Sequence, residues 1–321
     1  MLAIRIHETG GPEKLKAQEL PLPVPGTGQV RVRVAATGVN FVEVYHRQGL
    51  YPSPLPFTPG AEFAGTIDEV GPGVAGLKPG DRVATANGLG GYAEYALAAE
   101  DRLVLLPGSV SFEAAAALFL QGLTAHYLAT STWALKPGDT VLVHAAAGGV
   151  GLLLTQVAKR RGARVLGTVS TEEKAALSRQ AGADHVILYT QSDFVAEVEG
   201  LVGKKALDVV YDSVGKTTFE KSLGLLKPRG LMVLFGQSSG PVDPVNPLLL
   251  SRMGSLFLTR PTLADYVATR AELQGRMGDL FAWLNDGLEV RVDKRFSLAH
   301  AAEAHRYLES RASMGKVLLT P

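Results

Sequence analysis

A short glycine turn joins two apolar segments near the middle of the chain, and few folds accommodate that pattern. Residues 140–145 are mostly apolar, as in a buried strand, and a helix-like apolar run follows Gly151. A strand, a glycine turn and a helix start in this order form a dinucleotide-binding βα turn. Gly148 would let the backbone approach a pyrophosphate, and N–H groups at the helix start would hold its charge. Ala146 replaces the first glycine of the usual pattern, but the context still predicts a bound dinucleotide.

The size and charge of the chain limit its class. Its 321 residues suggest two domains, and 46% hydrophobic with 20% charged residues fits a globular enzyme. A formal net charge of +1 gives no basic field for nucleic acid. Cysteine is absent, which excludes disulfides, thiolate metal sites and a cysteine nucleophile. The sequence has no signal-peptide pattern and no membrane-length apolar run, so we expect a cytoplasmic protein without a membrane partner.

Secondary-structure signals change along the chain. Residues 1–110 are β-rich, with strands expected at 29–37, 65–70 and 91–96. Ser111 is a suitable N-cap for a helix that runs towards residue 130. Beyond it, strands and helices alternate, with strands at 140–145, 164–169, 184–189, 207–212 and 230–235 and helices such as 151–161 and 172–180. Alternation with short loops predicts an α/β fold, a doubly wound parallel sheet.

The C-terminal part departs from this alternation. We expect a sixth strand at 255–259, a long helix from Pro261 to about residue 286, a strand at 290–296, a helix at 299–309 and a strand at 316–320. The last three elements resemble the β-rich N-terminal region more than the alternating region. We therefore expect the tail to return to the first domain, which would make that domain discontinuous.

The choice of dinucleotide depends on the end of the second strand of the alternating region. An acidic residue there would bind the ribose 2′-hydroxyl of NAD. Here the strand ends at Ser170, and Glu172 and Glu173 are better placed to start the next helix. Lys174 lies one turn further, and Tyr189 closes the next strand at the same rim. Hydroxyl groups with an ammonium suit a 2′-phosphate, so we predict NADPH, although Lys174 could instead be only a solvated lysine of the helix.

Several ordered motifs give the chain a family resemblance. They are Gly38-Val39-Asn40-Phe41 with Tyr45, Gly49-Leu50-Tyr51-Pro52, the run 59–65, the turn at 145–151, the run 210–215 and Leu234-Phe235-Gly236. In these motifs the chain resembles the zeta-crystallin-like NADPH:quinone oxidoreductases of the medium-chain dehydrogenase/reductase superfamily. The resemblance implies a β-rich GroES-like catalytic domain of residues 1–122 and 262–321, and a Rossmann NADP-binding domain of residues 123–261.

Zinc-containing relatives in this superfamily carry metal ligands that this chain lacks. They place a cysteine near the position of Asn40 and a histidine at the position of Ala61, and they add a four-cysteine lobe. The residues here exclude those ligands, so we expect no metal. His144 lies on an expected core strand, where a structural role is the more frequent one.

Without a metal, the expected chemistry is hydride transfer from NADPH to an electron-poor conjugated substrate. The resemblance implies that Asn40 and Tyr45 lie near the nicotinamide, with Tyr51 on a loop close by. An amide N–H or a phenol O–H can stabilise a developing oxyanion. Tyr45 could instead only pack, and Tyr51 could only order a proline-rich turn. The resemblance also implies cofactor contacts at Asn40, Tyr45, Thr124, Ser213, Phe235, Gly236 and Arg311, although Arg311 could instead be a solvated surface residue. The glycine turn adds Ala147, Gly148, Gly149, Val150 and Gly151, and the rim of the sheet adds Ser170, Lys174 and Tyr189.

The sequence leaves the substrate and the assembly open. Reduction of a quinone and reduction of a 2-alkenal or enone use nearly the same chemistry. A third possibility is a non-catalytic NADPH-binding structural or RNA-binding protein, which the near-zero charge and the intact glycine turn disfavour. The apolar strand at 255–259 would be a poor exposed edge, so we predict a homodimer through it. The alternative is that a helix or loop of the same chain covers the edge.

Overall fold

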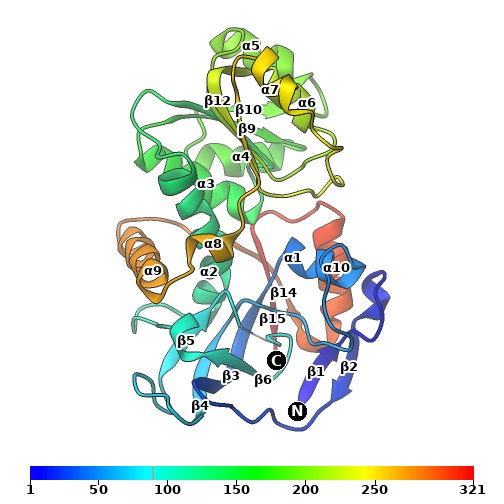
Figure 1. Cartoon of the computed structure of the whole chain (residues 1–321), viewed down its shortest axis with the longest axis vertical. Coiled ribbons are helices and arrows are strands. Elements are labelled where there is room, and N and C mark those ends of the chain that lie inside the picture. Colours follow the sequence, from blue (N-terminus) through cyan, green and yellow to red (C-terminus); the bar gives the residue numbers. More distant parts are fainter. Residues whose placement is uncertain (89) are drawn as a thin grey trace. The chain divides into compact units, whose positions relative to one another are not determined.

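The computed structural model describes residues 1–88 and 90–321, and its backbone forms two compact units (Figure 1). The first unit comprises Met1–Gln121, Val267–Phe281 and Val290–Pro321, and the second comprises Gly122–Tyr266 and Ala282–Glu289. The division of the chain predicted above stays a prediction. No described helix is long and apolar enough to cross a membrane.

The first unit is built mainly on β-strands. A seven-stranded sheet runs in the order β14-β15-β3-β4-β5-β7, with β6 paired to β3, and β1 and β2 form a separate pair. The bounds are β1 Leu2–Arg5, β2 Lys16–Glu19, β3 Gln29–Val39, β4 Phe63–Val70, β5 Arg82–Thr85, β6 Tyr95–Ala99, β7 Val104–Leu105, β14 Val292–Ser297 and β15 Lys316–Thr320. The last strand pairs antiparallel with β3, for example Leu318 with Gly38, so the C-terminal tail does join the sheet of the N-terminal region.

The α-helices of this unit belong to it wholly or in part. They are α1 Phe41–Gln48, α2 Phe112–Tyr127, α9 Arg270–Asn285 and α10 Ala301–Glu309. Ser111 caps α2, since its Oγ accepts the backbone N–H of Ala114 at 3.1 Å, as predicted. The helix continues as a π-helical turn, Leu128–Thr132. Buried Ile4, Val39, Leu298 and Val317 pack a core beside α10.

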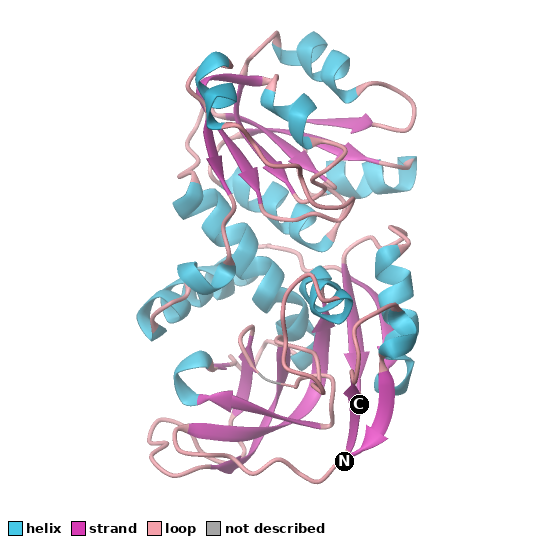
Figure 2. Ribbon diagram, turned by 45° about the vertical axis from the view of Figure 1, so that its right-hand side comes forward, coloured by secondary structure: helices cyan, strands magenta, loops and turns pink. Residues whose placement is uncertain are grey.

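The second unit is a six-stranded parallel sheet with helices on both of its faces (Figure 2). The strand order is β10-β9-β8-β11-β12-β13. The bounds are β8 Thr140–His144, α3 Gly149–Arg160, β9 Arg164–Val169, α4 Glu172–Gln180, β10 His185–Leu188, α5 Phe194–Val202, β11 Leu207–Asp212, α6 Phe219–Leu223, β12 Leu226–Leu234, α7 Pro247–Arg252, β13 Phe257–Thr259 and α8 Leu263–Tyr266. The predicted doubly wound α/β fold is confirmed. Because the order reverses between β8 and β11, ligands are expected outside the carboxyl ends of these two strands.

Three predicted elements are corrected by the structure. The strand expected at 255–259 is only Phe257–Thr259, because Ser255 has φ +54° and the Leu256 side chain turns into the core. The strand expected at 91–96 begins at Tyr95 instead. Residues 91 and 92 do not join this strand, because their N–H groups bond to the loop before β4. Gly91 N–H donates to the carbonyl of Gly60, and Tyr92 N–H donates to the carbonyl of Pro59.

The long helix expected after Pro261 is divided into α8 and α9. Thr269 interrupts it by starting a new helix with a reciprocal cap. Its hydroxyl accepts the N–H of Glu272 at 3.2 Å, and the Glu272 carboxylate accepts the N–H of Thr269 at 3.0 Å. This is the capping box that a Thr-x-x-Glu sequence predicts, so the break was readable from the residues.

Candidate functional site

The glycine turn after β8 has the geometry that phosphate binding requires. Ala145 takes a positive φ of +52°, and Gly148 N–H donates to its carbonyl at 2.9 Å. The chain then enters α3 at Gly149. A Cβ atom at Gly151 would lie 2.3 Å from the carbonyl oxygen of Ala145. Only glycine therefore lets α3 start this close to the strand.

The first turn of α3 supplies backbone donors. Leu152 N–H makes the first helical bond, to Gly148 at 2.9 Å, so the N–H groups of Gly149, Val150 and Gly151 precede the helical ladder. The positive end of the helix dipole adds to them. The turn Ala147–Gly151 thus fits a pyrophosphate at the point where the strand order reverses.

The structure brings Ser170 and Tyr189 together at the end of β9 and β10. Tyr189 N–H donates to Val169 at 3.1 Å, and the Thr190 hydroxyl donates to the carbonyl of Ser170 at 2.9 Å. Lys174 lies close by in the first turn of α4, where its N–H donates to the Thr171 cap at 3.3 Å.

Both glutamates after Ser170 belong to α4, as predicted, and Glu172 accepts a hydrogen bond from Arg179 at 3.0 Å. The end of β9 therefore presents no acidic residue at the place where NAD-binding folds put one. Hydroxyls and an ammonium at this rim fit a ribose 2′-phosphate better than a 2′-hydroxyl.

Ser213, Phe235 and Gly236 meet at the ends of β11 and β12. The N–H groups of Phe235 and Gly236 donate to the carbonyl of Asp212 at 2.9 and 3.3 Å. The buried Asp212 carboxylate accepts the N–H groups of Val214 and Gly215 and the hydroxyl of Thr218. Asp212 thereby fixes the loop that carries Ser213 beside the carboxyl end of β8.

The candidate catalytic residues of the first unit lie on one helix and the loop after it. Asn40 is the N-cap of α1, Tyr45 is buried in α1, and Tyr51 follows the helix. The rings of Tyr45 and Tyr51 meet edge to face with centroids 5.3 Å apart. The structure thus brings these three residues to one segment, while their roles in catalysis stay predictions.

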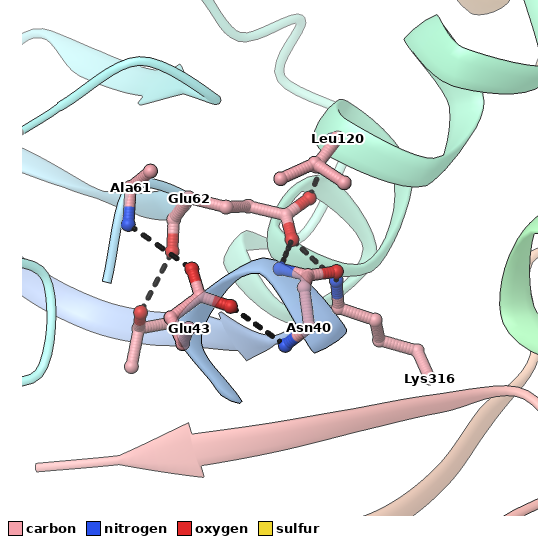
Figure 3. A network of polar contacts seen from close by, with 7 residues as sticks. Asn40, Glu43, Ala61, Glu62, Leu120 and Lys316 are labelled. Atoms are coloured by element: carbon pink, nitrogen blue, oxygen red, sulfur yellow. Dashed lines mark hydrogen bonds and ion pairs between the residues drawn. The ribbon is translucent and has the colours of Figure 1, made fainter. Parts of the chain in front are cut away.

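The side chain of Asn40 belongs to a buried polar network (Figure 3). Its amide Nδ2 donates to the carboxylate of Glu62 at 3.0 Å, and its Oδ1 accepts from the ammonium of Lys316 at 2.7 Å. Lys316 and Glu62 form an ion pair in which both side chains are almost fully buried. The second oxygen of Glu62 accepts the N–H of Leu120 in α2 at 2.6 Å.

Glu43 is a second buried carboxyl beside this network. It accepts the N–H of Asn40 at 2.9 Å, which caps α1, and that of Ala61 at 3.4 Å. Burial raises the pKa of Glu43 to about 7, which the nearby Lys316 ammonium opposes and the Glu62 charge reinforces. This carboxyl therefore changes its protonation near neutral pH.

Two further residues were predicted as cofactor contacts. Thr124 is buried in α2, and Arg311 follows α10 with a φ of +62°. Their contacts with a cofactor stay predictions. His144 is a structural residue, as expected, since its two ring nitrogens bond to Thr168 and Ser222 at 2.9 Å.

Sequence reasoning missed Glu43, Glu62 and Lys316 as members of the site. A signal existed for Glu43, since Asn-x-x-Glu is a capping-box pattern. Glu62 and Lys316 are charged residues at the ends of apolar strands, which by itself indicates nothing about pairing. Across residues 1–88 and 90–321, no group of three or more His, Cys, Asp or Glu side chains is arranged to hold a metal.

Comparisons with known proteins agree with this architecture. The family described as "Alcohol dehydrogenase GroES-like domain" matches residues 26–108, and the one described as "Zinc-binding dehydrogenase" matches residues 149–283. A quinone oxidoreductase of Pseudomonas aeruginosa is 48% identical, with 99% of each chain covered. A 2-haloacrylate reductase of Burkholderia is 43% identical, over 100% of this chain and 99% of the relative.

A solved structure gives the same result for the whole fold. The Escherichia coli quinone oxidoreductase complexed with NADPH superposes with a TM-score of 0.98 at 45% identity, and each chain is covered in full.

Proposed function

This chain belongs to the quinone oxidoreductases of the medium-chain dehydrogenase/reductase superfamily, and from that premise we propose that it reduces quinones with NADPH. The protein is an NADPH-dependent oxidoreductase. Because Asn40 and Ala61 stand where zinc-containing relatives carry metal ligands, hydride transfer in this proposal needs no metal. The carrying observation is the Ala147–Gly151 turn at the β8–β11 switch point, with Ser170, Lys174 and Tyr189 at the neighbouring rim.

Bound NADPH supplies the hydride, and the protein provides binding, orientation and hydrogen bonds. The first-turn N–H groups of α3 would hold the pyrophosphate, and Lys174 with Ser170 and Tyr189 would hold the 2′-phosphate. Asn40 and Tyr45 donate hydrogen bonds to the substrate oxygen as it gains negative charge. Neither an amide nor a phenol loses its proton near neutral pH, so these donors persist across the working range.

The test is steady-state oxidation of NADPH against a panel of quinones and enones, with and without a strong chelator. We expect turnover with quinones that chelation leaves unchanged. Loss of activity with chelator, restored by zinc, would contradict the metal-free mechanism. Absence of turnover with every quinone would contradict the proposal itself. Absence of turnover with every enone as well would favour a non-catalytic NADPH-binding protein.

A second candidate substrate class is an activated alkene. The 2-haloacrylate reductase, which is 43% identical over nearly the whole of both chains, favours it. The two candidates differ in where the hydride is added, at a quinone ring or at a carbon–carbon double bond. A higher kcat/KM for enones than for quinones in the same panel would select the second.

Replacing Lys174 with alanine should erode the preference for NADPH over NADH. A charge-assisted hydrogen bond to phosphate contributes roughly 1.5–3 kcal/mol, so NADPH should bind about 10- to 100-fold more weakly. NADH, which has no 2′-phosphate, should bind as before. Fluorescence titration of both nucleotides measures the change. Lys204→Ala, at an exposed lysine of the same unit, is the control, and an equal loss for NADH would refute the assignment.

We also propose that the protein is a homodimer through β13, the last strand of the sheet order. With only three residues, β13 offers less backbone pairing than predicted, but Phe257 leaves 57% of its surface exposed there. An apolar side chain on an unpaired edge favours association. If the strand covered residues 255–259, Leu256→Pro would be the natural test of this interface, because proline removes a backbone donor. Leu256 is buried, however, so that substitution would damage the core and would not test the interface.

Phe257→Asp should convert the dimer into a monomer, because a carboxylate would be buried at the interface. Light scattering at micromolar concentration measures the mass. Val24→Asp, at a residue of the first unit that is 77% exposed, should leave the mass unchanged. A wild-type monomer would exclude the dimer, and a dimeric Phe257→Asp variant would place the interface elsewhere. The cytoplasmic location and the absence of a nucleic-acid partner stay predictions.

A further inference from the structure

The Glu62–Lys316 ion pair determines which way the Asn40 amide points. The ammonium of Lys316 can only donate hydrogen bonds, and an ionised carboxylate can only accept them. Lys316 therefore selects Oδ1 of Asn40, and Glu62 selects Nδ2. In a flipped amide, Nδ2 of Asn40 would face the Lys316 ammonium, and Oδ1 would face the Glu62 carboxylate. Both contacts would be repulsive, and the repulsion costs more free energy in a site shielded from water than it would at the surface.

The pair leaves part of the amide available. One N–H of Asn40 donates to Glu62, and no group in residues 1–88 and 90–321 accepts the second. Asn40 keeps 5% of its surface exposed, whereas Lys316 keeps 1% and Glu62 none. All three residues are buried, and Asn40 retains the largest exposed fraction of the three, so a substrate that approaches this network would meet Asn40 before the ion pair. A cation on Oδ1 also polarises the amide and makes its remaining N–H a stronger donor.

The strand beneath the ion pair is shaped to hold it. A Cβ atom at Gly38 would lie 2.0 Å from the Glu62 carboxylate and 2.6 Å from the Lys316 ammonium. The two charged groups therefore fill the space that a side chain at position 38 would need. This explains why the Gly38-Val39-Asn40 motif begins with glycine, although the residue is not at a turn.

From this geometry we propose that Glu62 and Lys316 are positioning residues, which act by orienting and polarising the Asn40 amide as an oxyanion donor. The inference rests on the proposed reduction of quinones with NADPH and extends it. Neither residue contacts the substrate; each acts through Asn40 alone. A purely structural pair would instead support the fold without any dependence on the side chain at position 40.

A double-mutant cycle on kcat separates the two roles. Asn40→Ala removes the donor, and Glu62→Gln removes the charge that orients it while keeping the shape. Each single change should lower kcat by about tenfold or more, since loss of one oxyanion donor has effects of this order or larger. KM for quinone and for NADPH should change by less than about threefold. In the Asn40→Ala background, Glu62→Gln should then lower kcat no further.

Gly38→Ala provides a second route to the same result, because the added methyl displaces the ion pair without removing a charge. It should lower kcat in the wild-type background and not in the Asn40→Ala background. If circular dichroism shows that Glu62→Gln does not fold, the Gly38→Ala variant alone decides whether the ion pair acts through Asn40. Asp68→Asn is the matched control. It removes a carboxylate of β4 that pairs with Arg31 of β3, and it should leave kcat unchanged.

The outcomes distinguish this inference from the function on which it rests. Equal losses from Glu62→Gln or Gly38→Ala in both backgrounds would show a structural role and overturn the inference while quinone reduction stands. Wild-type kcat in Asn40→Ala would do the same, since there would be no donor to position. If the wild-type protein fails to oxidise NADPH with any quinone tested, both the inference and the proposed function are overturned.

Discussion

Gly151→Ala is expected to weaken NADPH binding and destabilise the protein, whereas Gly200→Ala, a similar change in the same unit, should do neither. The new methyl at position 151 would lie 2.3 Å from the Ala145 carbonyl oxygen and 2.8 Å from the Ala146 Cα. Both are backbone atoms, so the turn and the start of α3 must separate. Overpacking of this kind costs about 1–3 kcal/mol of stability.

The same displacement moves the N–H groups that are expected to hold the pyrophosphate. We expect the Kd for NADPH to rise at least about tenfold, which corresponds to about 1.4 kcal/mol. Gly200 lies in α5 with no atom within 4 Å of its added Cβ. Alanine there should stabilise the helix by about 0.5–1 kcal/mol. Nucleotide titration and thermal unfolding of both variants measure the contrast, and wild-type affinity in Gly151→Ala would contradict the assignment of the turn.

Glu43→Gln is expected to make the protein more stable than the wild type above neutral pH, and to change little near pH 5. Burial raises the pKa of Glu43 from 4.5 to about 7, so the folded protein holds this proton more tightly than the unfolded chain. The unfolded state then binds fewer protons between about pH 4.5 and 7, and the free energy of unfolding falls as the pH rises through that window. Above it, the buried charge costs the wild type a few kcal/mol, since one pKa unit is about 1.4 kcal/mol.

Other buried groups act in the opposite direction, so the variant must be compared with the wild type at each pH. Burial and the nearby Arg47 lower the pKa of His305 to about 3. The contribution of His305 to the free energy of unfolding is complete at pH values above its ordinary pKa of 6.5. That contribution is lost as the pH falls towards 3. Because His305 is present in both proteins, its contribution cancels in the difference.

Urea unfolding from pH 5 to 9 measures that difference. Glu197→Gln, at an exposed carboxyl of α5, should show no such dependence. A stability difference between wild type and Glu43→Gln that stays constant from pH 5 to 9 would contradict the raised pKa.

The residues that could be interpreted from sequence act through their immediate neighbours. The β8–α3 turn, the cap at Ser111 and the helix at Glu172–Gln180 each depend on a few consecutive residues. The strands Arg164–Val169, Leu207–Asp212 and Lys316–Thr320 have the predicted bounds. The start of α9 at Thr269 could also have been predicted from local sequence, because Thr269 and Glu272 form a capping box that was overlooked.

The two strand errors have a common physical cause, which is competition from distant partners. Gly91 and Tyr92 have strand-like neighbours, but their N–H groups bond to residues 59 and 60. Leu256 continues an apolar run, yet the core removes it from β13. Periodicity records which residues are apolar. It does not record which of several apolar contacts is the most favourable in the folded chain.

The sequence by itself determined the doubly wound sheet, the place of the dinucleotide turn and the absence of cysteine ligands, because each depends on local pattern or on composition. Only the tertiary structure decided the hydrogen-bond partners and the orientation of the Asn40 side chain. Its partners Glu62 and Lys316 are 254 residues apart in the chain, and neither carries a local signal of the other. They meet because β15 pairs with β3 and thereby brings the C-terminal lysine beside the start of α1. A buried charge needs such a partner to remain ionised, and no short stretch of sequence can show that the partner is there.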